Sequence, residues 1–194
     1  MQIPIIISLV LSATTLPSIS PTTQQELFQK SNSISVSKSK KTLKSIYLQS
    51  NKNHTFYCGC SFDTNKTIDH DSCNYSPRIK SNKRSHRLEF EHIVPAHALG
   101  KNLQCWKKPI CEKRNGKKYK GRKCCSKISD EYKQMQSDMH NLFPSVGEVN
   151  GDRSNFIFGE IYGEERKYGE CDFEVAERIA EPKKSIRGDI ARSY

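Results

Sequence analysis

The most apolar stretch of the chain lies at its start, where residues 3–11 are mostly Ile, Leu and Val. Small and polar residues follow it up to Ser20. The stretch is too short to cross the ~30 Å apolar core of a bilayer, and its layout is typical of a secretory signal peptide. We therefore expect residues 1–20 to be removed. A buried N-terminal strand is the alternative, because no Lys or Arg precedes Glu26.

Polar residues dominate the next segment, residues 21–55, which is rich in Ser, Lys, Asn and Thr. This composition predicts a solvated lead-in that ends in a short helix at residues 42–48. The globular part is expected to run from Phe56 to Tyr194 as one domain, because the length of the chain is usual for a single domain.

Residues 88–94 alternate between apolar and polar side chains, which predicts a strand that Pro95 ends. Glu91 and His92 are neighbours in this strand. Adjacent side chains of a regular strand point to opposite faces, so these two can share a site only where the strand frays or bulges. An exposed glutamate beside a hydrogen-bonded histidine is the alternative for this pair.

A helix is predicted at residues 130–139 and a second one directly after Pro144. At the start of the second helix, Ser145 is placed to cap the backbone. Glu148, three residues later, is placed to reach back to the N–H of the capping residue.

One face of this second helix carries Val146, Val149, Asn150 and Arg153, which are spaced by three, four and seven residues. We expect that face to point inward. A buried Asn must find a partner or cost ~1–3 kcal/mol, and its amide oxygen is a suitable ligand for a hard cation. A metal ligand and an ordinary buried hydrogen bond are equally compatible with this position.

The chain is strongly basic, with 32 Lys and Arg against 21 Asp and Glu and a net charge of +11. The positive charge is concentrated in residues 78–87 and in residues 101–123. We interpret the second of these segments, residues 101–123, as a long loop. Such clusters bind polyanions by releasing counterions from phosphates. A solvated surface that keeps the protein in solution explains the charge equally well.

Eight cysteines in an exported chain of this length predict disulfides formed in an oxidising compartment. A structural zinc site is the alternative. Its usual paired Cys-x2–4-Cys spacing is missing, however, because Cys58 and Cys60 are separated by one residue and Cys124 and Cys125 are adjacent.

His92 is the side chain of the predicted strand that is suited to taking a proton from water near neutral pH. Hydrolysis of a phosphodiester also needs a divalent cation to neutralise the phosphate, and Mg²⁺ prefers oxygen ligands. Glu91 offers one such oxygen and Asn150 offers another.

Five ordered blocks of this sequence resemble the bacterial endonuclease I family of periplasmic and secreted nucleases. They are Phe-Tyr-Cys-Gly-Cys at 56–60, Glu-His-Ile-Val-Pro-Ala at 91–96, Gln-Cys-Trp at 104–106, Asp-Met-His-Asn-Leu at 138–142 and Gly-Glu-Val-Asn-Gly-Asp-Arg-Ser-Asn at 147–155. The similarity extends from about Phe56 to the C-terminus.

The resemblance implies an α+β domain with disulfides and a ββα-metal (His-Me finger) core, in which a strand pair and a helix hold one Mg²⁺. It implies cleavage of DNA, and of RNA as well, with little sequence preference and with 5′-phosphate products. Glu91 and Asn150 match the family's metal ligands, His92 its general base and Arg122 its phosphate-binding arginine. The expected cofactor is Mg²⁺, with Mn²⁺ or Ca²⁺ as substitutes. The expected state is a periplasmic or secreted monomer.

The chain departs from the family pattern in three places. The segment between Trp106 and Cys125 is longer and brings extra cysteines, of which Cys111 and Cys124 are expected to pair, so that Arg114 rivals Arg122 as the phosphate contact. The pattern normally continues beyond Tyr194 with two further cysteines, which predicts that one or two cysteines here lack partners. Phe90 stands where a Trp is common, which we interpret as a tolerated change in aromatic packing.

A basic, disulfide-rich module that binds nucleic acid or an anionic surface without catalysis is the competing function. In that case Glu91 and Asn150 would be structural hydrogen-bonding groups. Replacement of His92 separates the two functions, because only an enzyme would lose turnover while its DNA binding remains.

Overall fold

The computed structural model describes residues 35–163 and 165–194. The expected signal peptide, residues 1–20, and the first part of the expected lead-in, residues 21–34, lie outside the described residues. Within the described part of the chain, no helix is both long and apolar enough to cross a membrane.

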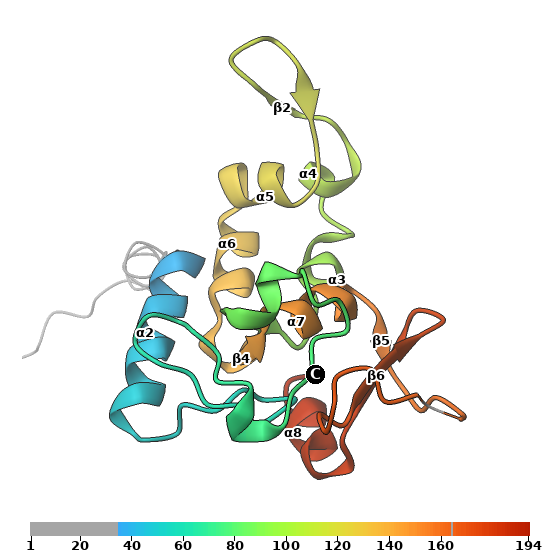
Figure 1. Ribbon diagram of the computed structural model, residues 1–194. Coiled ribbons are helices and arrows are strands. Elements are labelled where there is room, and N and C mark those ends of the chain that lie inside the picture. The colour runs from blue at the N-terminus through green and yellow to red at the C-terminus, as the bar shows by residue number, and fades with distance from the viewer. Residues whose placement is uncertain (1–34, 164) are drawn as a thin grey trace, which may run out of the picture. The chain divides into compact units, whose positions relative to one another are not determined.

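Helices and strands are mixed along the described chain, as expected for an α+β domain (Figure 1). The α-helices are α2 (Val36–Gln49), α3 (Ala96–Gly100), α4 (Gln104–Lys107), α5 (Arg122–Ile128), α6 (Asp130–Ser137), α7 (Gly147–Arg153) and α8 (Arg187–Arg192). The strands are β1 (Leu88–His92), β2 (Cys111–Glu112), β3 (Lys118–Tyr119), β4 (Leu142–Val146), β5 (Ile157–Phe158), β6 (Phe173–Ala176) and β7 (Ile179–Pro182). Short 3₁₀ helices are η1 (Asp71–Cys73), η2 (Lys83–His86), η3 (Met139–Asn141) and η4 (Lys184–Ile186).

Strands β1 and β4 pair antiparallel, and α7 follows β4 directly. Leu88 faces Val146 at one end of the pair, and His92 faces Leu142 at the other. Helix α7 packs against both strands. The predicted strand is confirmed, although it ends at His92, two residues before the predicted end.

The predicted capping box at the start of the second helix is wrong. Ser145 belongs to β4 and is fully buried, and its hydroxyl donates to the carbonyl of Val146. The helix begins one residue later, after Val146, with no side-chain cap. Pairing of β4 with β1 across five residues outweighs the local capping preference.

Helix α2 is longer than the predicted helix at residues 42–48 and contains it. Ser35 caps its start, accepting a hydrogen bond from the N–H of Lys38. Only Ser39 and Leu43 of this helix are buried, and the Ser39 hydroxyl donates to the carbonyl of Ser137 at the end of α6. The exposed remainder explains why this segment of the sequence is polar.

The main core lies between the β1–β4 pair, α7 and a three-stranded sheet in the order β5-β7-β6. Strand β7 pairs parallel with β5 and antiparallel with β6. Aromatic rings fill much of the space between these elements; Tyr57, for instance, lies 4.4 Å from Phe173 between ring centroids.

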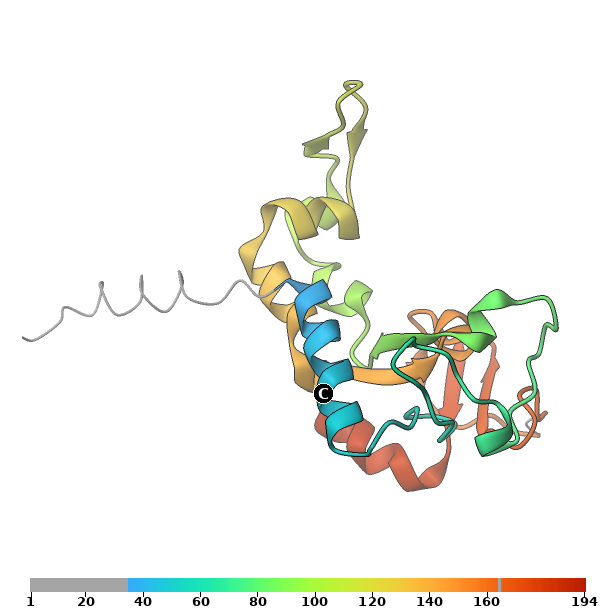
Figure 2. The same ribbon diagram turned by 60° about the vertical axis from the view of Figure 1, so that its left-hand side comes forward.

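A second, smaller cluster holds α4, α5 and α6 together around two disulfides and the buried ring of Tyr132. The prediction that the basic segment at residues 101–123 is a long loop is therefore wrong. It contains the helix α4, the start of α5 and an antiparallel hairpin of β2 and β3. The hairpin extends away from the helices at its base in both views (Figures 1 and 2).

All eight cysteines form disulfides. The pairs are Cys58–Cys171, Cys60–Cys73, Cys105–Cys125 and Cys111–Cys124. The predicted pairing of Cys111 with Cys124 is confirmed. The zinc alternative and the expectation of unpaired cysteines are both wrong, because every sulfur is bonded to another one.

Candidate functional site

A cavity of about 580 Å³ brings together the four residues that the sequence singled out. Glu91 and His92 come from the end of β1, Asn150 from α7 and Arg122 from the start of α5. Residues from α2, α3 and α4 complete its wall.

Glu91 and His92 line the same cavity although they are neighbours in a strand. Both belong to β1 and pair with β4, Glu91 opposite Phe143 and His92 opposite Leu142, and His92 is the last residue of the strand. Both side chains are buried, with exposed fractions of 4% for Glu91 and 6% for His92. The expected bulge is therefore absent from this part of the described chain, and the two neighbours line one cavity at the last two residues of a regularly paired strand.

Glu91 is held by a buried arginine. Nη1 of Arg153 donates to Oε1 of Glu91 at 2.9 Å, and Arg153 itself is completely buried. The same guanidinium donates to the carbonyls of His92 and Ile93. Arg153 therefore ties the carboxylate and the end of β1 to α7.

Burial raises the pKa of Glu91 to about 7, because desolvation of the carboxylate outweighs the opposing charge of Arg153. Arg153 and, more weakly, Lys40 act in the opposite direction and favour the carboxylate. A further positive charge beside Glu91 would lower the pKa of its carboxyl group and so favour the ionised carboxylate.

The hydrogen bond of His92 determines which of its nitrogens is basic. Nε2 lies 2.9 Å from the carbonyl oxygen of Gln136, which can only accept, so Nε2 carries the proton. Nδ1 is then the basic nitrogen, and it has no hydrogen-bond partner among the described residues. Burial lowers the pKa of His92 to about 4, which leaves the imidazole neutral at neutral pH.

Asn150 is half-buried on the inward face predicted for its helix, where Val149 and Arg153 are fully buried. Its Nδ2 donates to Oε2 of Glu89 at 2.7 Å. This bond uses the nitrogen of the amide and leaves the oxygen available. The hydrogen bond and a ligand role, which the sequence could not distinguish, are therefore compatible.

Glu89 is a positioning group that the sequence motifs did not reveal. Its carboxylate accepts from the guanidinium groups of Arg84 and Arg87 in addition to Asn150. The hydrogen bonds from the two arginines lower the pKa of Glu89 despite its partial burial. Glu89 therefore stays ionised and keeps accepting from the Asn150 amide. The sequence signal that could have revealed Glu89 is its spacing of two residues from Glu91, because residues two apart in a strand lie on the same face.

The oxygen donors of the cavity suit a hard divalent cation. Glu91 offers a carboxylate and Asn150 an amide oxygen, which are ligand types that Mg²⁺ accepts. In the described part of the chain, no three His, Cys, Asp or Glu side chains form a cluster that could enclose a metal ion. A cation at Glu91 and Asn150 would keep several waters, which Mg²⁺ tolerates well.

Besides the two arginines that are paired with Glu89 and Glu91, two cationic side chains line the cavity. Arg122 lines it, whereas its rival Arg114 does not. Lys40 reaches it from α2 and donates to the carbonyl of Phe90 at 3.2 Å. Burial and the charge of Arg122 lower the pKa of Lys40. No signal in the sequence pointed to Lys40 beyond the charge of its segment.

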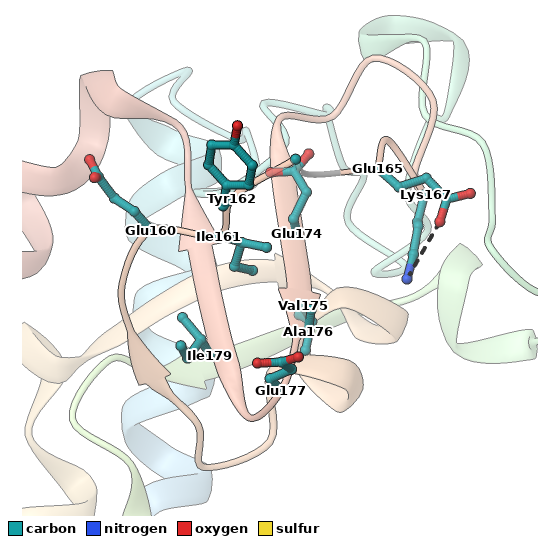
Figure 3. Close-up of a pocket in the computed structure, with 11 residues that line it drawn as sticks. Glu160, Ile161, Tyr162, Glu165, Lys167, Glu174, Val175, Ala176, Glu177 and Ile179 are labelled. Carbon is teal, nitrogen blue, oxygen red and sulfur yellow. Dashed lines mark ion pairs between the residues drawn. The ribbon is translucent and has the colours of Figure 1, made fainter.

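A second cavity, of about 440 Å³, lies against β6 and β7 and contains none of the predicted site residues (Figure 3). Glutamates from several segments line it, and the one lysine in its wall, Lys167, is paired with Glu165. This lining would repel phosphate, so the cavity beside β1 is the candidate for phosphodiester chemistry.

Comparisons with known proteins find a family and several relatives. The sequence model of the family described as Endonuclease I matches residues 19–194. A periplasmic deoxyribonuclease from Aeromonas hydrophila is 45% identical over 146 residues, which are 72% of this chain and 56% of that relative. An extracellular deoxyribonuclease from the same organism is 46% identical over 146 residues, 72% of this chain and 58% of that relative.

A relative from Buchnera aphidicola subsp. Acyrthosiphon pisum (strain APS), described as Endonuclease-1, is 40% identical over 155 residues. The match covers 77% of this chain and 57% of that relative. The chain therefore spans a little more than half the length of the relatives it matches.

Proposed function

Because this chain belongs to the endonuclease I family, we propose that it is a metal-dependent endonuclease that hydrolyses phosphodiester bonds of DNA with little sequence preference. One observation carries the proposal: Glu91, His92, Asn150 and Arg122 line one cavity. RNA is proposed as a further substrate, and a monomer as the active form.

The proposed location is the periplasm or the outside of the cell. Two relatives are described as periplasmic and extracellular deoxyribonucleases. Four disulfides support an oxidising compartment, because the cytosol keeps thiols reduced.

Glu91 and Asn150 are proposed to hold the metal, with Mg²⁺ as the natural ion and Mn²⁺ or Ca²⁺ as substitutes. The strand pair β1–β4 and helix α7 would then form the ββα-metal core that the family resemblance implies. When bound, the ion supplies neutralisation of the negative charge on the phosphate. Arg153 and Glu89 keep the two ligands oriented through their hydrogen bonds to Glu91 and Asn150.

His92 is proposed to take a proton from the attacking water at Nδ1. The imidazole is neutral before the reaction, and the carbonyl of Gln136 accepts from Nε2–H in both charge states, so the ring keeps its orientation. Attack on phosphorus breaks the bond to the 3′ oxygen, which takes a proton from solvent. The products are then a 5′-phosphate and a 3′-hydroxyl.

Arg122 is proposed to bind the phosphate. A guanidinium can donate two parallel hydrogen bonds to phosphate oxygens and remains charged at any working pH. Its place in the same cavity as His92 allows it to stabilise the charge that develops during attack.

Plasmid cleavage by the oxidised protein tests the proposal. We expect nicking with Mg²⁺, none with excess chelator, and a loss of about 10²–10⁴-fold in rate for His92→Ala, with salt-dependent DNA binding retained. The matched control is His140→Ala, because the side chain of His140 is 98% exposed. Wild-type rates for His92→Ala would disprove the general-base role. Binding without any cleavage by the wild type would favour the non-catalytic module.

A further inference from the structure

The hairpin of β2 and β3 carries four basic residues around its turn. Lys113, Arg114, Lys117 and Lys118 are all exposed, and the turn between them is closed by hydrogen bonds between Lys113 and Lys117 and between Gly116 and Lys113. Both ribbon views show this hairpin extending from the helices α4 and α5 (Figures 1 and 2).

None of these four side chains forms an ion pair with another described residue. Glu112 is the one acidic residue among residues 111–123. Elsewhere in the described chain, arginines pair with nearby carboxylates, as Arg78 does with Asp152. The positive charge of the hairpin is therefore available to an external anion.

The hairpin is fixed to the helix that carries Arg122. Cys111, at its base, is bonded to Cys124 of α5. Gly121 donates from its backbone to the carbonyl of Cys105, and Nζ of Lys120 donates to the carbonyl of Lys107. These links hold the hairpin in place before any ligand binds, which lowers the entropy cost of binding.

A groove of about 610 Å³ lies between the hairpin and α5 and reaches the proposed active site. Arg122 lines both this groove and the cavity of Glu91 and His92. Six basic side chains and one acidic side chain line the groove, together with Tyr119: Lys113, Arg114, Lys120, Arg122, Lys123, Lys127 and Glu112.

We propose that this hairpin is a second binding surface for duplex DNA, which holds the phosphates on one side of the bond that is cut. The inference rests on the proposed nuclease function and extends it from the cleaved phosphate to its neighbours. A series of exposed cations that continues from Arg122 matches the regular series of phosphates along a strand.

The dimensions agree with binding to several phosphates. Four residue steps separate Cys111 from Asn115 in the turn, which limits this arm of the hairpin to about 13 Å at ~3.3 Å per extended residue. Phosphates of one strand are about 3.4 Å apart along the helix axis, so an arm laid along that axis can face at most about four of them. Binding to phosphates carries no sequence information, in keeping with the proposed low sequence preference.

The test replaces Lys113, Arg114, Lys117 and Lys118 by Gln in a protein that also carries His92→Ala, so that bound DNA is cut far more slowly. Affinity for a 30-base-pair duplex is measured over a range of NaCl concentrations. The slope of log K against log[NaCl] is expected to become shallower by about 0.9 for each phosphate that the variant no longer neutralises, and by up to ~3.6. With His92 present, KM for long DNA should rise while kcat stays the same.

The matched control replaces three lysines and one arginine outside the hairpin, Lys52, Arg178, Lys183 and Lys184, by Gln. A slope that is unchanged in the hairpin variant overturns the inference. An equal change of slope in the control also overturns it, because net charge alone would then explain binding. These binding readouts do not depend on turnover, so failure of the nuclease proposal would appear separately, as a wild-type protein that binds DNA but does not cut it.

Discussion

At the scale of single residues, burial of the pair of Arg153 and Glu91 carries a desolvation cost that opposes folding. Taking both charges out of water costs several kcal/mol per ion, which mutual attraction offsets only with good geometry and further hydrogen bonds. Arg153 has that geometry, because it also donates to two carbonyls and lies 4.5 Å over the ring of Phe158. The pair positions a carboxylate at the cavity. We infer that this position, and not a gain in stability, is what the desolvation cost of the pair provides.

The raised pKa of Glu91 predicts that the proposed metal binding depends on pH. The ionised carboxylate of Glu91 is the proposed ligand, and in the metal-free protein that form is lost as the pH falls through about 7. We expect the Mg²⁺ affinity, measured by calorimetry without DNA, to be about tenfold weaker at pH 6 than at pH 8.

His92→Ala is the control for this measurement. The pKa of His92 is lowered to about 4, so His92 does not change charge between pH 6 and pH 8, and the variant should show the same pH dependence. A constant Mg²⁺ affinity over this range would contradict the assignment of Glu91 as the titrating ligand.

At the scale of elements, α7 connects the site to a distant part of the chain. One face carries Val149, Asn150 and Arg153 toward β1, while Glu148 and Asp152 hold the segment at residues 75–82. Glu148 is 1% exposed. It accepts hydrogen bonds from the hydroxyl of Tyr75, the backbone N–H groups of Arg78 and Ile79, and the amide of Asn82.

Glu148→Ala should therefore lower the free energy of unfolding by about 3–5 kcal/mol, because the buried hydroxyl of Tyr75 and three part-buried donors lose their acceptor at once. Urea denaturation measures this change. Glu131→Ala is the matched control, since Glu131 is an exposed glutamate of α6, and it should cost less than about 1 kcal/mol. Similar decreases in the two variants would contradict the structural role of Glu148.

The same element shows what the sequence could and could not predict. The spacing of Val146, Val149 and Asn150 predicted the inward face of α7, because helical periodicity is local. The role of Glu148 was mistaken for a cap, because its partners lie about 70 residues earlier in the chain.

Other elements were hard to predict for similar physical reasons. The hairpin strands β2 and β3 contain two residues each and bury little, so no apolar alternation marks them. Lys40 enters the cavity from a helix whose mostly polar surface resembles a solvated segment. Glu91, His92 and Asn150, in contrast, were singled out as candidates by their side-chain chemistry and local spacing, and the resemblance of their motifs to a known family supported that choice.

At the scale of the whole molecule, four disulfides link the described elements within two groups. Cys58–Cys171 and Cys60–Cys73 lie at the main core, whereas Cys105–Cys125 and Cys111–Cys124 lie in the cluster under the hairpin. The loops they close differ greatly in length, with a sequence separation of 113 for Cys58–Cys171 and 13 for Cys111–Cys124.

This difference in loop length predicts unequal effects on stability. In the chain-entropy account, a bridge over 113 residues contributes about 5 kcal/mol and one over 13 residues about 3 kcal/mol. Cys58→Ser with Cys171→Ser should thus lower the free energy of unfolding by about 2 kcal/mol more than Cys111→Ser with Cys124→Ser. Urea denaturation of both oxidised double variants measures the difference, and equal decreases would contradict the entropic account.

The placement of the bridges also bears on resistance to proteolysis. The exposed hairpin, rich in Lys and Arg, is a natural target for trypsin-like proteases. A cut after Arg114 falls inside the loops closed by Cys58–Cys171, Cys105–Cys125 and Cys111–Cys124. Three disulfides would then join the two fragments. The nicked protein would therefore migrate as one species in non-reducing electrophoresis, and a reducing agent would separate the fragments.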